Sequence, residues 1–478
     1  MGRKEGIKMN TKISYIGSAV ILIGSILLLL ARPLEDQLGD QGQLALVGIV
    51  LTLGIWIFRP FGLPFSAGAF FFAAYMLAIG LPAATVFSGY THSAIWTLVA
   101  ALFFGFVLQK TGLGHRVAFM ILKLFKPTYV SMIIAWTLIG VALSLLTPSM
   151  TVRVAIMMPI AVNCCELCGL KPGSKGNSLI LLTAFIMALI PGEGWLTGSL
   201  TGPVIQGSFE SVEALQGVLT SNSYLKMCII PLELTTVLVL VGSLIFFRPE
   251  EKLSAEAAKA IREEKLGRIS RDEVVTAVIL IICFLLFFFG ETLGISSLIV
   301  CLGATFLFFA FGIIKPTEVG TGISWDLIVF LGMALALGNI CQSTGIIDWL
   351  SSLVVPALAP VSGNPYLFVG TVTAFLFVWH LVDIACYFPT FIILPPILPA
   401  ISKAYGVDPL VFVPILCLAC CAFFMAYQNQ WAIMSERVAK ERSWTAGHLF
   451  RYSLIYFGAS MISILVCVPI FQSWGLIG

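Results

Sequence analysis

The feature that most constrains the fold is a polar interruption, Thr147-Pro148-Ser149-Met150-Thr151-Val152-Arg153, inside an apolar run from Tyr129 to Asn163. Hydroxyls and a guanidinium at that depth of an apolar run indicate a functional site. The stretches on either side of Pro148 are each too short to cross a bilayer core of about 30 Å. Together they predict a re-entrant hairpin, near residues 130–164, that enters the membrane, breaks at a polar tip and returns.

The composition indicates a membrane setting for the whole chain. Of 478 residues, 59% are hydrophobic and 11% are charged, whereas soluble domains are about a quarter charged. The predicted fold class is an all-α polytopic membrane protein, with the lipid bilayer as its surroundings and no nucleic-acid partner. We expect about 11 transmembrane helices and a second hairpin near residues 366–401. The spans lie near 13–31, 44–58, 64–81, 92–109, 176–206, 227–247, 273–289, 293–314, 325–341, 408–433 and 451–473.

The charged residues divide between the two ends of these spans, which predicts an orientation. With a cytoplasmic N-terminus, the cytoplasmic side receives most basic groups: Arg3, Lys4, Lys8, Lys12, Lys110, His115, Arg116, Lys123, Lys126, Lys171, Lys175, those between Arg248 and Arg271, Arg437, Lys440 and Arg442. The opposite side receives Glu35, Asp36, Asp40, Glu210, Glu213 and Glu291. This asymmetry follows the positive-inside rule. We therefore expect a multi-pass protein of the cytoplasmic (plasma) membrane whose first apolar run is retained as a helix.

The chain divides into two halves that echo each other. Residues 1–248 form the first half-repeat, a charged, Ala-rich cytoplasmic linker covers 249–272, and residues 273–478 form the second half-repeat. Trp96–Gly112 resembles Trp325–Gly345, and a single offset of 236 pairs Pro159 with Pro395, Trp195 with Trp431 and Ser199 with Ser435. The charge asymmetry requires an odd number of crossings in each half, so the repeats are inverted. Inverted repeats place a binding site at the midplane, here between the two hairpin tips and the breaks in the helices of residues 176–206 and 408–433.

The backbone at such breaks gives the physical reason for a site. A break exposes unpaired N–H groups where one half-helix starts and carbonyl groups where the other ends, and neither can stay bare in lipid. The positive N-terminal ends suit an anion. Carbonyls and hydroxyls, such as those of Ser149, Thr151 and Ser199, suit a small hard cation.

At these residues the chain resembles the divalent anion:sodium symporters, which carry di- and tricarboxylates and sulfate. Ser149-Met150-Thr151 is similar to the family's Ser-Asn-Thr hairpin tip, and Thr147–Arg153 is closest to the citrate, oxoglutarate and malate translocator branch. Gln109–Gly114 and Gly194–Ser199 are also family-like. The resemblance implies an elevator-type homodimer that carries a small anionic substrate, a di- or tricarboxylate or a sulfate-like oxyanion.

The predicted site residues come from both tips and both breaks. The expected substrate-binding residues are Ser149, Met150, Thr151, Arg153, Thr197, Ser199, Cys386, Tyr387 and Asn429. The expected cation- or proton-coupling residues are Ser149, Glu193, Gly194, His380, Asp383 and Gln428. Met150 stands where the family has Asn, and Ala385-Cys386-Tyr387 stands at the second Ser-Asn-Thr, so cation symport and anion exchange both stay open. Apart from sodium no cofactor is expected, and the bulky Met150 and Tyr387 favour a smaller dianion or one with an apolar part.

Three ionisable positions each have two interpretations. Arg153 either binds a carboxylate bidentately or pairs with Glu193, Asp383 or a carbonyl and fixes the hairpin. Glu193, between two glycines, either binds a cation or proton or caps a helix end and neutralises Arg153. His380 and Asp383, one helical turn apart, form either a proton-coupling pair or a hydrogen-bonded pair that orders the second hairpin.

Other function classes fit less well. A cation:proton antiporter on a related broken-helix plan would use Glu193 and Asp383 as titrating groups. An intramembrane enzyme or channel would need a facing nucleophile and base or a continuous polar stripe, and the sequence has neither. No Walker A loop is present, so ATP is not expected to drive the protein. Cys164, Cys165 and Cys168, with Cys417, Cys420 and Cys421, are interpreted as packing residues rather than a metal site.

Overall fold

The computed structural model describes residues 11–126, 128–249, 251, 253, 267–290, 293–383 and 387–478, and these ranges are helical with connecting turns. Within them, nine helices are long and apolar enough to cross a membrane. Each of the eleven predicted spans coincides with a helix or a broken helix, so the chain is a multi-pass membrane protein. Several predictions lie outside the described residues: those for Arg3, Lys4, Lys8, Glu291 and Cys386, and for the Ala-rich part of the linker.

The first half begins with helix α1, which has no counterpart in the second half. The helices are α1 (Thr11–Ala31), α2 (Glu35–Phe58), α3 (Phe65–Ala78), α4 (Ala83–Val86), α5 (Ser93–Thr111), α6 (Leu113–Leu122), α7 (Tyr129–Leu146), α8 (Met150–Leu167), α9 (Lys175–Met187), the 3-10 turn η3 (Ile190–Gly194), α10 (Thr201–Glu210) and α11 (Ser221–Phe247). The predicted first hairpin coincides with α7 and α8, and the predicted broken helix with α9, η3 and α10. The expectation that both arms of this hairpin are too short to cross a bilayer was wrong, because α7 and α8 are 18-residue helices, each long and apolar enough to do so.

The second half repeats this order of elements. It runs through α13 (Arg271–Phe289), α14 (Ser297–Ala310), α15 (Trp325–Ser343), α16 (Ile346–Leu358), α17 (Pro365–Trp379), α18 (Phe388–Ile393), α19 (Leu398–Tyr405), α20 (Phe412–Cys420), the 3-10 turn η10 (Ala426–Gln428), α21 (Gln430–Ala439) and α22 (Ala446–Ser473). The helices α17 to α19 form the second hairpin, and α20, η10 and α21 form the second broken helix.

Two glycines mark the same point in both halves. Gly112 ends α5 with φ of 78°, and Gly345, directly before α16, has φ of 73°. This left-handed conformation is open to glycine without the steric penalty of a side chain. The two Gln-x-Thr-Gly sequences that suggested a repeat therefore make the same turn. The sequence did not predict that α6 and α16, which follow these turns, are separate short helices.

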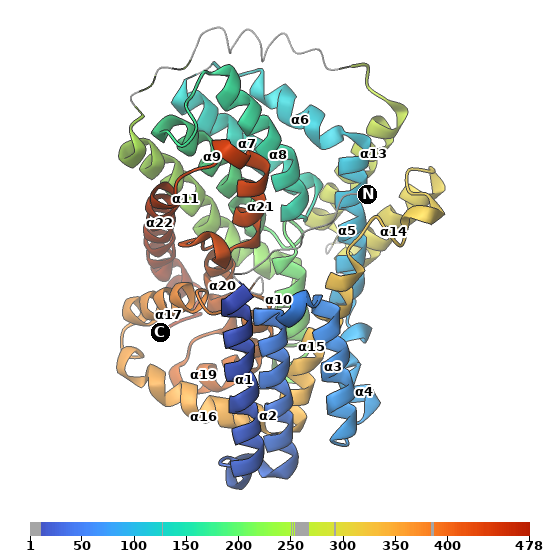
Figure 1. The fold of residues 1–478 in the computed structure, drawn as a ribbon, viewed down its shortest axis with the longest axis vertical. Helices are drawn as coiled ribbons and strands as arrows, with labels where there is room; N and C mark the ends of the chain where they lie inside the picture. Colours follow the sequence, from blue (N-terminus) through green and yellow to red (C-terminus); the bar gives the residue numbers. More distant parts are fainter. Residues whose placement is uncertain are drawn as a thin grey trace.

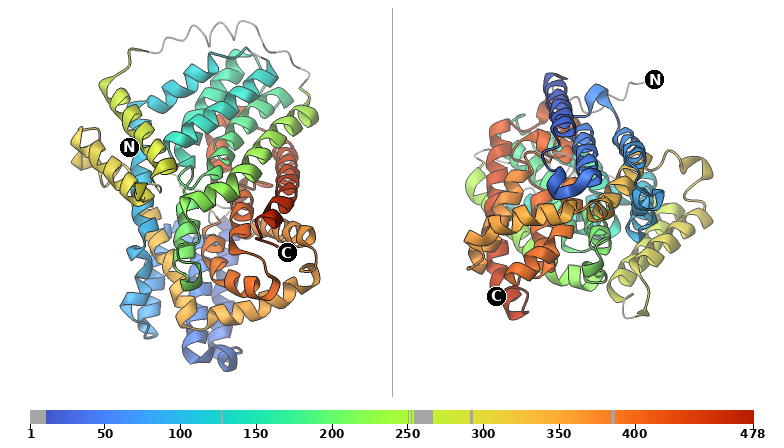
Figure 2. Two further views of the ribbon diagram at one scale, coloured as in Figure 1. Left: turned by 180° about the vertical axis from the view of Figure 1, so that it is seen from behind. Right: turned by 90° about the horizontal axis from the view of Figure 1, so that it is seen from below.

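The two halves lie in opposite directions. In Figure 1, α5 leads up to α6 and the hairpin α7–α8, whereas α15 leads down to α16 and the second hairpin with α17 and α19. Helices α11 and α22, the last of each half, pack side by side, and Figure 2 shows this pair again from behind. Both views of Figure 2 also place α13 and α14 at one edge of the molecule. The half-helices α10 and α20 lie between the two hairpins, near the middle of the molecule.

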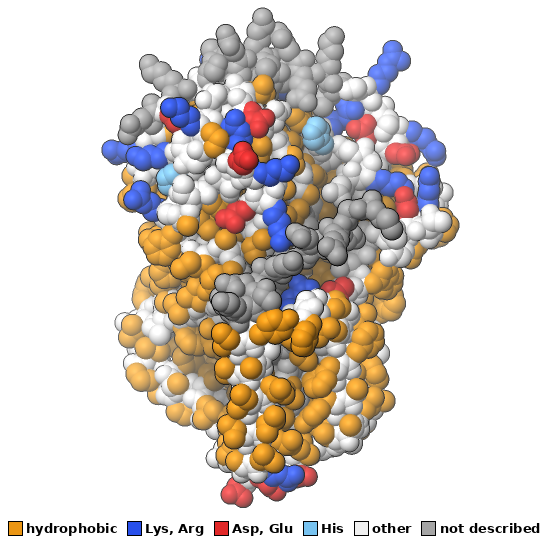
Figure 3. Space-filling model, viewed as in Figure 1, with side chains coloured by type: hydrophobic (Ala, Val, Ile, Leu, Met, Phe, Trp, Pro, Cys, Tyr) orange, Lys and Arg blue, Asp and Glu red, His pale blue; other side chains and the backbone are white. Residues whose placement is uncertain are grey.

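Charge divides between the two ends of the molecule. Figure 3 shows most Lys and Arg side chains in the upper part, over the end that carries α6 to α9, and a broad apolar surface below. A few charges, mostly acidic, lie at the lowest point, where α1 turns into α2. Between α5 and the segment before α15, Lys110 donates to both carboxylate oxygens of Glu318, at 2.7 and 2.5 Å. The uneven distribution of basic side chains in Figure 3 agrees with the charge asymmetry that the sequence predicted.

Candidate functional site

The first hairpin tip is a helix start built by two hydroxyl groups. Thr147 ends α7 in an extended conformation, and its Oγ1 accepts a hydrogen bond from the N–H of Ser149, at 3.2 Å. Ser149 caps α8 by accepting from the N–H of Val152, at 3.3 Å. The tip packs closely on α5, since a Cβ atom on Gly105 would lie 3.1 Å from Cβ of Ser149. The polar heptapeptide therefore starts a half-helix whose positive end opens at the tip.

Arg153 is fully buried one turn into α8 and joins the tip to the first break. Its Nε donates to the carbonyl of Ala188 at 2.6 Å, and its Nη1 donates to the carbonyls of Thr147, at 3.1 Å, and of Gly198. Its Nη2 has no hydrogen-bond acceptor in the described structure. Three backbone carbonyls accept the hydrogen bonds of Nε and Nη1. These contacts fit the interpretation in which Arg153 pairs with carbonyls and fixes the hairpin.

The first break is organised around this guanidinium. A Cβ on Gly192 would lie 2.6 and 2.7 Å from Nη1 and Nη2 of Arg153, so only glycine leaves room for it. Glu193 is also fully buried, and the hydroxyls of Thr201 and Ser199 lie close to its carboxyl. Its Oε2 has no hydrogen-bond partner among the described atoms. A buried carboxylate and a buried guanidinium thus share one break, where each lowers the desolvation penalty of the other.

The second tip places an aromatic residue where the family motif would have a hydroxyl. Tyr387 is buried in the left-handed conformation, with φ of 63°. Its ring stacks on His380 with centroids 4.7 Å apart, and its hydroxyl donates to the carbonyl of Leu376. Asp383 accepts from both the N–H and the hydroxyl of Thr390, at 3.0 and 2.6 Å, and so orders the start of α18.

His380 lies between two backbone carbonyls of the second broken helix. Its Nδ1 is 2.9 Å from the oxygen of Ala419, and its Nε2 is 3.1 Å from the oxygen of Gln428. Carbonyl oxygens only accept hydrogen bonds, so both contacts are satisfied only when both ring nitrogens carry hydrogen. A neutral ring donates to only one of the two carbonyls.

The two breaks are therefore satisfied in the same way. In each half a basic side chain near the tip reaches one carbonyl at the end of the first half-helix and one carbonyl inside the break. Ala188 and Gly198 are the two acceptors in the first half, and Ala419 and Gln428 are their counterparts in the second. Arg153 and His380 occupy the carbonyl groups that the sequence suggested for a small cation.

A contact between the two halves joins the starts of two half-helices. Asn429 caps α21 by accepting from the N–H groups of Trp431 and Ala432, at 3.0 and 3.2 Å. The indole Nε1 of Trp431 donates to Oγ1 of Thr151, in the first turn of α8, at 3.1 Å. Thr151 is exposed, whereas Trp431 and Asn429 are buried. The positive ends of α8 and α21 therefore converge beside an accessible hydroxyl.

The other predicted residues surround these contacts at different depths. Met150 is 2% exposed and packs in the core, and Ser199 is fully buried, with Oγ 3.2 Å from the N–H of Thr201. Gly194 faces α11, where a Cβ on it would lie 3.4 Å from Oε1 of Glu233. Thr197 is partly exposed.

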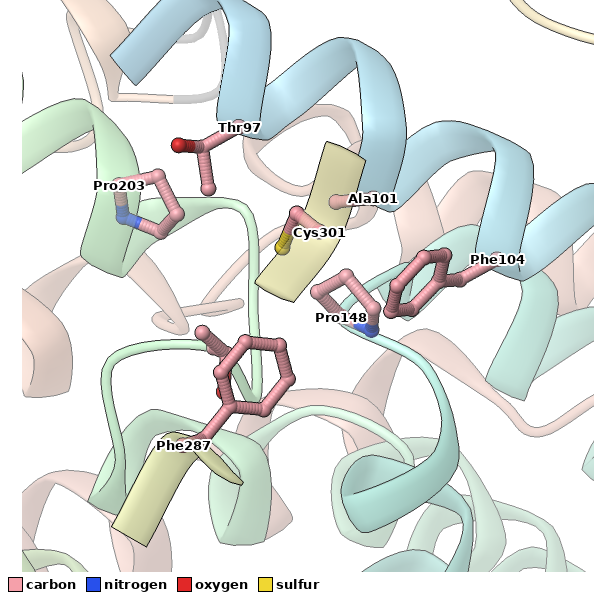
Figure 4. Close-up of a pocket in the computed structure, with 8 residues that line it drawn as sticks. Thr97, Ala101, Phe104, Pro148, Pro203, Phe287 and Cys301 are labelled. Carbon is pink, nitrogen blue, oxygen red and sulfur yellow. The ribbon is translucent and has the colours of Figure 1, made fainter. Parts of the chain in front are cut away.

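Thr197 lines a small pocket between the first tip, the first break and the neighbouring helices, shown in Figure 4. The side chains of Thr97, Ala101 and Phe104 from α5 form one wall. Pro148 from the tip, Pro203 from α10, Phe287 from α13 and Cys301 from α14 complete the lining. The pocket is mostly apolar, so it offers few polar groups to a dianion.

The sequence reasoning missed two groups of residues. Glu233 is a carboxylate in the middle of α11, and its position inside an apolar span was a signal that could have found it. Cys420 and Cys421 lie at the second break, with Cys420 Sγ 3.9 Å from Oε1 of Glu193. No sequence signal could have found this approach, because it joins residues of opposite halves.

The comparison with protein families shows which family the chain belongs to. The family model for the sodium:sulfate symporter transmembrane region matches residues 12–474. The chain belongs to this family. The match covers both halves, and it confirms the resemblance that the tip and break motifs carried.

Similar curated proteins cover large parts of the chain at low identity. Dicarboxylate transporter 1, chloroplastic, of Arabidopsis thaliana is 25% identical over 372 residues, which are 76% of this chain and 66% of that protein. The putative malate transporter YflS of Bacillus subtilis is 24% identical, and the match covers 66% of this chain and 66% of that protein. The citrate/succinate antiporter of Escherichia coli K12 is 22% identical, and the match covers 62% of this chain and 61% of that protein. The chain thus spans just under two thirds of the length of these relatives.

A solved structure supports the fold. The YdaH transporter of Alcanivorax borkumensis, described as having an unusual topology, covers 83% of this chain and 89% of its own, with a TM-score of 0.57 and 13% identity. At this identity the likeness concerns the arrangement of helices alone.

Proposed function

We propose that this protein is a secondary transporter that exchanges small organic dianions, of the dicarboxylate class, across the membrane. Membership of the sodium:sulfate symporter family supports this proposal, as do the relatives named as dicarboxylate, malate and citrate/succinate transporters. The predicted function classes of enzyme and channel have no comparable support. Transport follows the elevator scheme, in which both hairpins and both broken helices move together.

The observation that carries the proposal is the convergence of two half-helix starts. The first turns of α8 and α21 meet through the hydrogen bond from Trp431 to Thr151. Ser149 and Asn429 cap some N–H groups at these starts, but each helix start keeps a partial positive charge equivalent to about half an elementary charge. Two such ends beside an exposed hydroxyl suit a substrate with two negative groups, one for each helix.

The choice of exchange over sodium symport rests on the two buried basic side chains. A sodium ion at a helix break would need carbonyl oxygens as ligands. In this protein Arg153 holds the carbonyls of Ala188 and Gly198, and His380 holds those of Ala419 and Gln428. Basic side chains already occupy these carbonyls at both breaks, so we propose that transport does not depend on sodium.

The setting of the transporter is part of the same proposal. We place it in the plasma membrane with the N-terminus in the cytoplasm, because the basic side chains gather at the end that carries α6 to α9. We also propose a homodimer, as the family resemblance implies.

A thermal-shift screen of the purified protein tests the proposal. Dicarboxylates, citrate, sulfate and alkali cations are each added in sodium and in choline buffers at two pH values. A ligand that binds only the folded protein raises Tm by mass action. We expect shifts with dicarboxylates that are equal in sodium and choline. Shifts that need sodium would replace exchange by symport, and a response to cations or pH without any anion effect would favour a cation:proton antiporter.

A further inference from the structure

The two breaks also meet at a cluster of sulfur and carboxylate groups that the proposed anion exchange does not use. Cys420 Sγ lies 3.8 Å from Cys421 Sγ and 3.9 Å from Oε1 of Glu193. The three ligand atoms all lie within 4.8 Å of one another, and all three residues are buried. Glu193 comes from the first break and the cysteines from the end of α20, so the cluster spans both halves of the protein.

Two of these separations are close to the edges of a tetrahedral coordination site. With Zn–S bonds of about 2.3 Å and Zn–O bonds of about 2.0 Å, two sulfur ligands lie ~3.8 Å apart and a sulfur and an oxygen ~3.5 Å apart. The distance between the two sulfur atoms agrees with the first value, and the distance from Cys420 Sγ to Oε1 of Glu193 exceeds the second by a few tenths of an ångström.

Glu193 supplies an independent sign that a ligand is missing. Its side chain is fully buried, and its Oε2 has no hydrogen-bond partner among the described atoms, although a buried carboxylate oxygen normally has one. The donors near the carboxyl are the hydroxyls of Thr201 and Ser199 and the weak thiol donor of Cys420, which lies 3.9 Å from Oε1. A cation beside the carboxylate would also satisfy Oε2.

The surrounding groups border the site and balance its charge. The hydroxyl of Thr201 lies 3.9 Å from Cys420 Sγ, at the edge of the cluster. Arg153 interacts electrostatically with both Glu193 and Cys421. A divalent ion that displaces one proton from each thiol adds two positive charges and removes two, so the total charge of the buried cluster does not change.

We propose that Glu193, Cys420 and Cys421 form a binding site for a soft or borderline divalent metal ion of the Zn²⁺ and Cd²⁺ class. Thiolate ligands select such ions over Mg²⁺ and Ca²⁺. The bound ion ties the first break to the second at a point beside Arg153. The proposal does not depend on which anion is carried, or on whether the protein transports anions.

The test measures metal directly and uses a matched pair of cysteines as its control. Wild type, Cys420→Ser/Cys421→Ser, Glu193→Gln and Cys164→Ser/Cys165→Ser are purified from cells grown with zinc, and zinc is counted by plasma mass spectrometry. The proteins are then titrated with Co²⁺, whose thiolate charge-transfer and d–d bands report tetrahedral sulfur ligation. The control pair is also adjacent and buried, but in the described structure it belongs to no cluster of three such ligands.

We expect about one metal ion per chain and the Co²⁺ bands in wild type and in the Cys164/Cys165 variant. The Cys420/Cys421 variant should lose both signals, and Glu193→Gln should keep the sulfur bands with at least tenfold weaker binding. Gel filtration and Tm without metal establish that each variant is folded. Metal in wild type that persists in the Cys420/Cys421 variant, or a folded wild type that takes up neither zinc nor Co²⁺, overturns the proposal.

Discussion

Replacing Arg153 by Ala tests whether this side chain fixes the fold or binds the substrate. In the structure the guanidinium satisfies three buried carbonyls, those of Ala188, Thr147 and Gly198. A buried polar group left without its partner costs about 1 to 3 kcal/mol, and removal of one member of a buried charged array costs roughly 3 to 5 kcal/mol. We therefore expect the Ala variant to lose about 3 to 5 kcal/mol of stability.

This loss converts to a measurable shift in Tm. Unfolding carries an entropy of about 2.1 cal/mol/K per residue, which is on the order of 1 kcal/mol/K for a chain of this length. Arg153→Ala should therefore melt about 3 to 5 °C below wild type without any ligand. Arg153→Lys keeps the charge but not the forked donors, so its Tm should lie between the two.

The assay is thermal unfolding in detergent, followed by tryptophan fluorescence, with and without a dicarboxylate. The structural role predicts that ligand-free Tm falls in both variants and that any residual binding is weaker because the break is disordered. An Arg153→Ala protein with a ligand-free Tm within ~1 °C of wild type, but with no ligand-induced shift, would refute this reasoning. Arg153 would then act mainly as a substrate ligand.

Three further predictions follow from single contacts. Trp431→Phe and Thr151→Val each remove the hydrogen bond between the halves, so each should lower Tm slightly. A double-mutant cycle should give a coupling free energy of about 1 kcal/mol. Additive effects of the two substitutions would mean that the bond is absent. Gly105→Val should impair transport more than Gly105→Ala. A Cβ on residue 105 would already lie 3.1 Å from Cβ of Ser149, and the methyl groups of Val would press further into the first tip. Equal transport by both variants would exclude this close packing. The lysine donor beside Glu318 holds the pKa of that carboxyl below its ordinary value of 4.5, so the ion pair contributes stability above that pH and loses it as the pH falls. Tm of Glu318→Gln should thus lie below wild type at pH 7 and approach it in acid, and a difference that does not change with pH would contradict this linkage.

The sequence predicted the architecture well because its signals are local. The apolar runs, the Pro148 break and the two Gln-x-Thr-Gly turns depend on residues close together in the chain, and the structure confirms the helices and both glycine turns. Short amphipathic helices such as α6 were missed because connecting segments of mixed polarity resemble loops.

The site was harder to predict because its contacts join distant segments. The sequence indicated that Arg153 and His380 matter, but not that each binds two carbonyls of a broken helix. The hydrogen bond from Trp431 to Thr151 connects residues 280 positions apart. The approach of Cys420 to Glu193 spans 227 positions. Packing of the two halves creates these contacts, and no single stretch of sequence encodes them.

Uptake into proteoliposomes is the measurement that tests the central claim most directly. Vesicles containing the protein are loaded with an unlabelled dicarboxylate, and uptake of the labelled dicarboxylate is followed in sodium and in choline buffers. We expect uptake that requires the internal dicarboxylate and has the same rate in both buffers. Uptake that needs external sodium and no internal anion would contradict exchange by a carrier whose breaks are occupied by basic side chains.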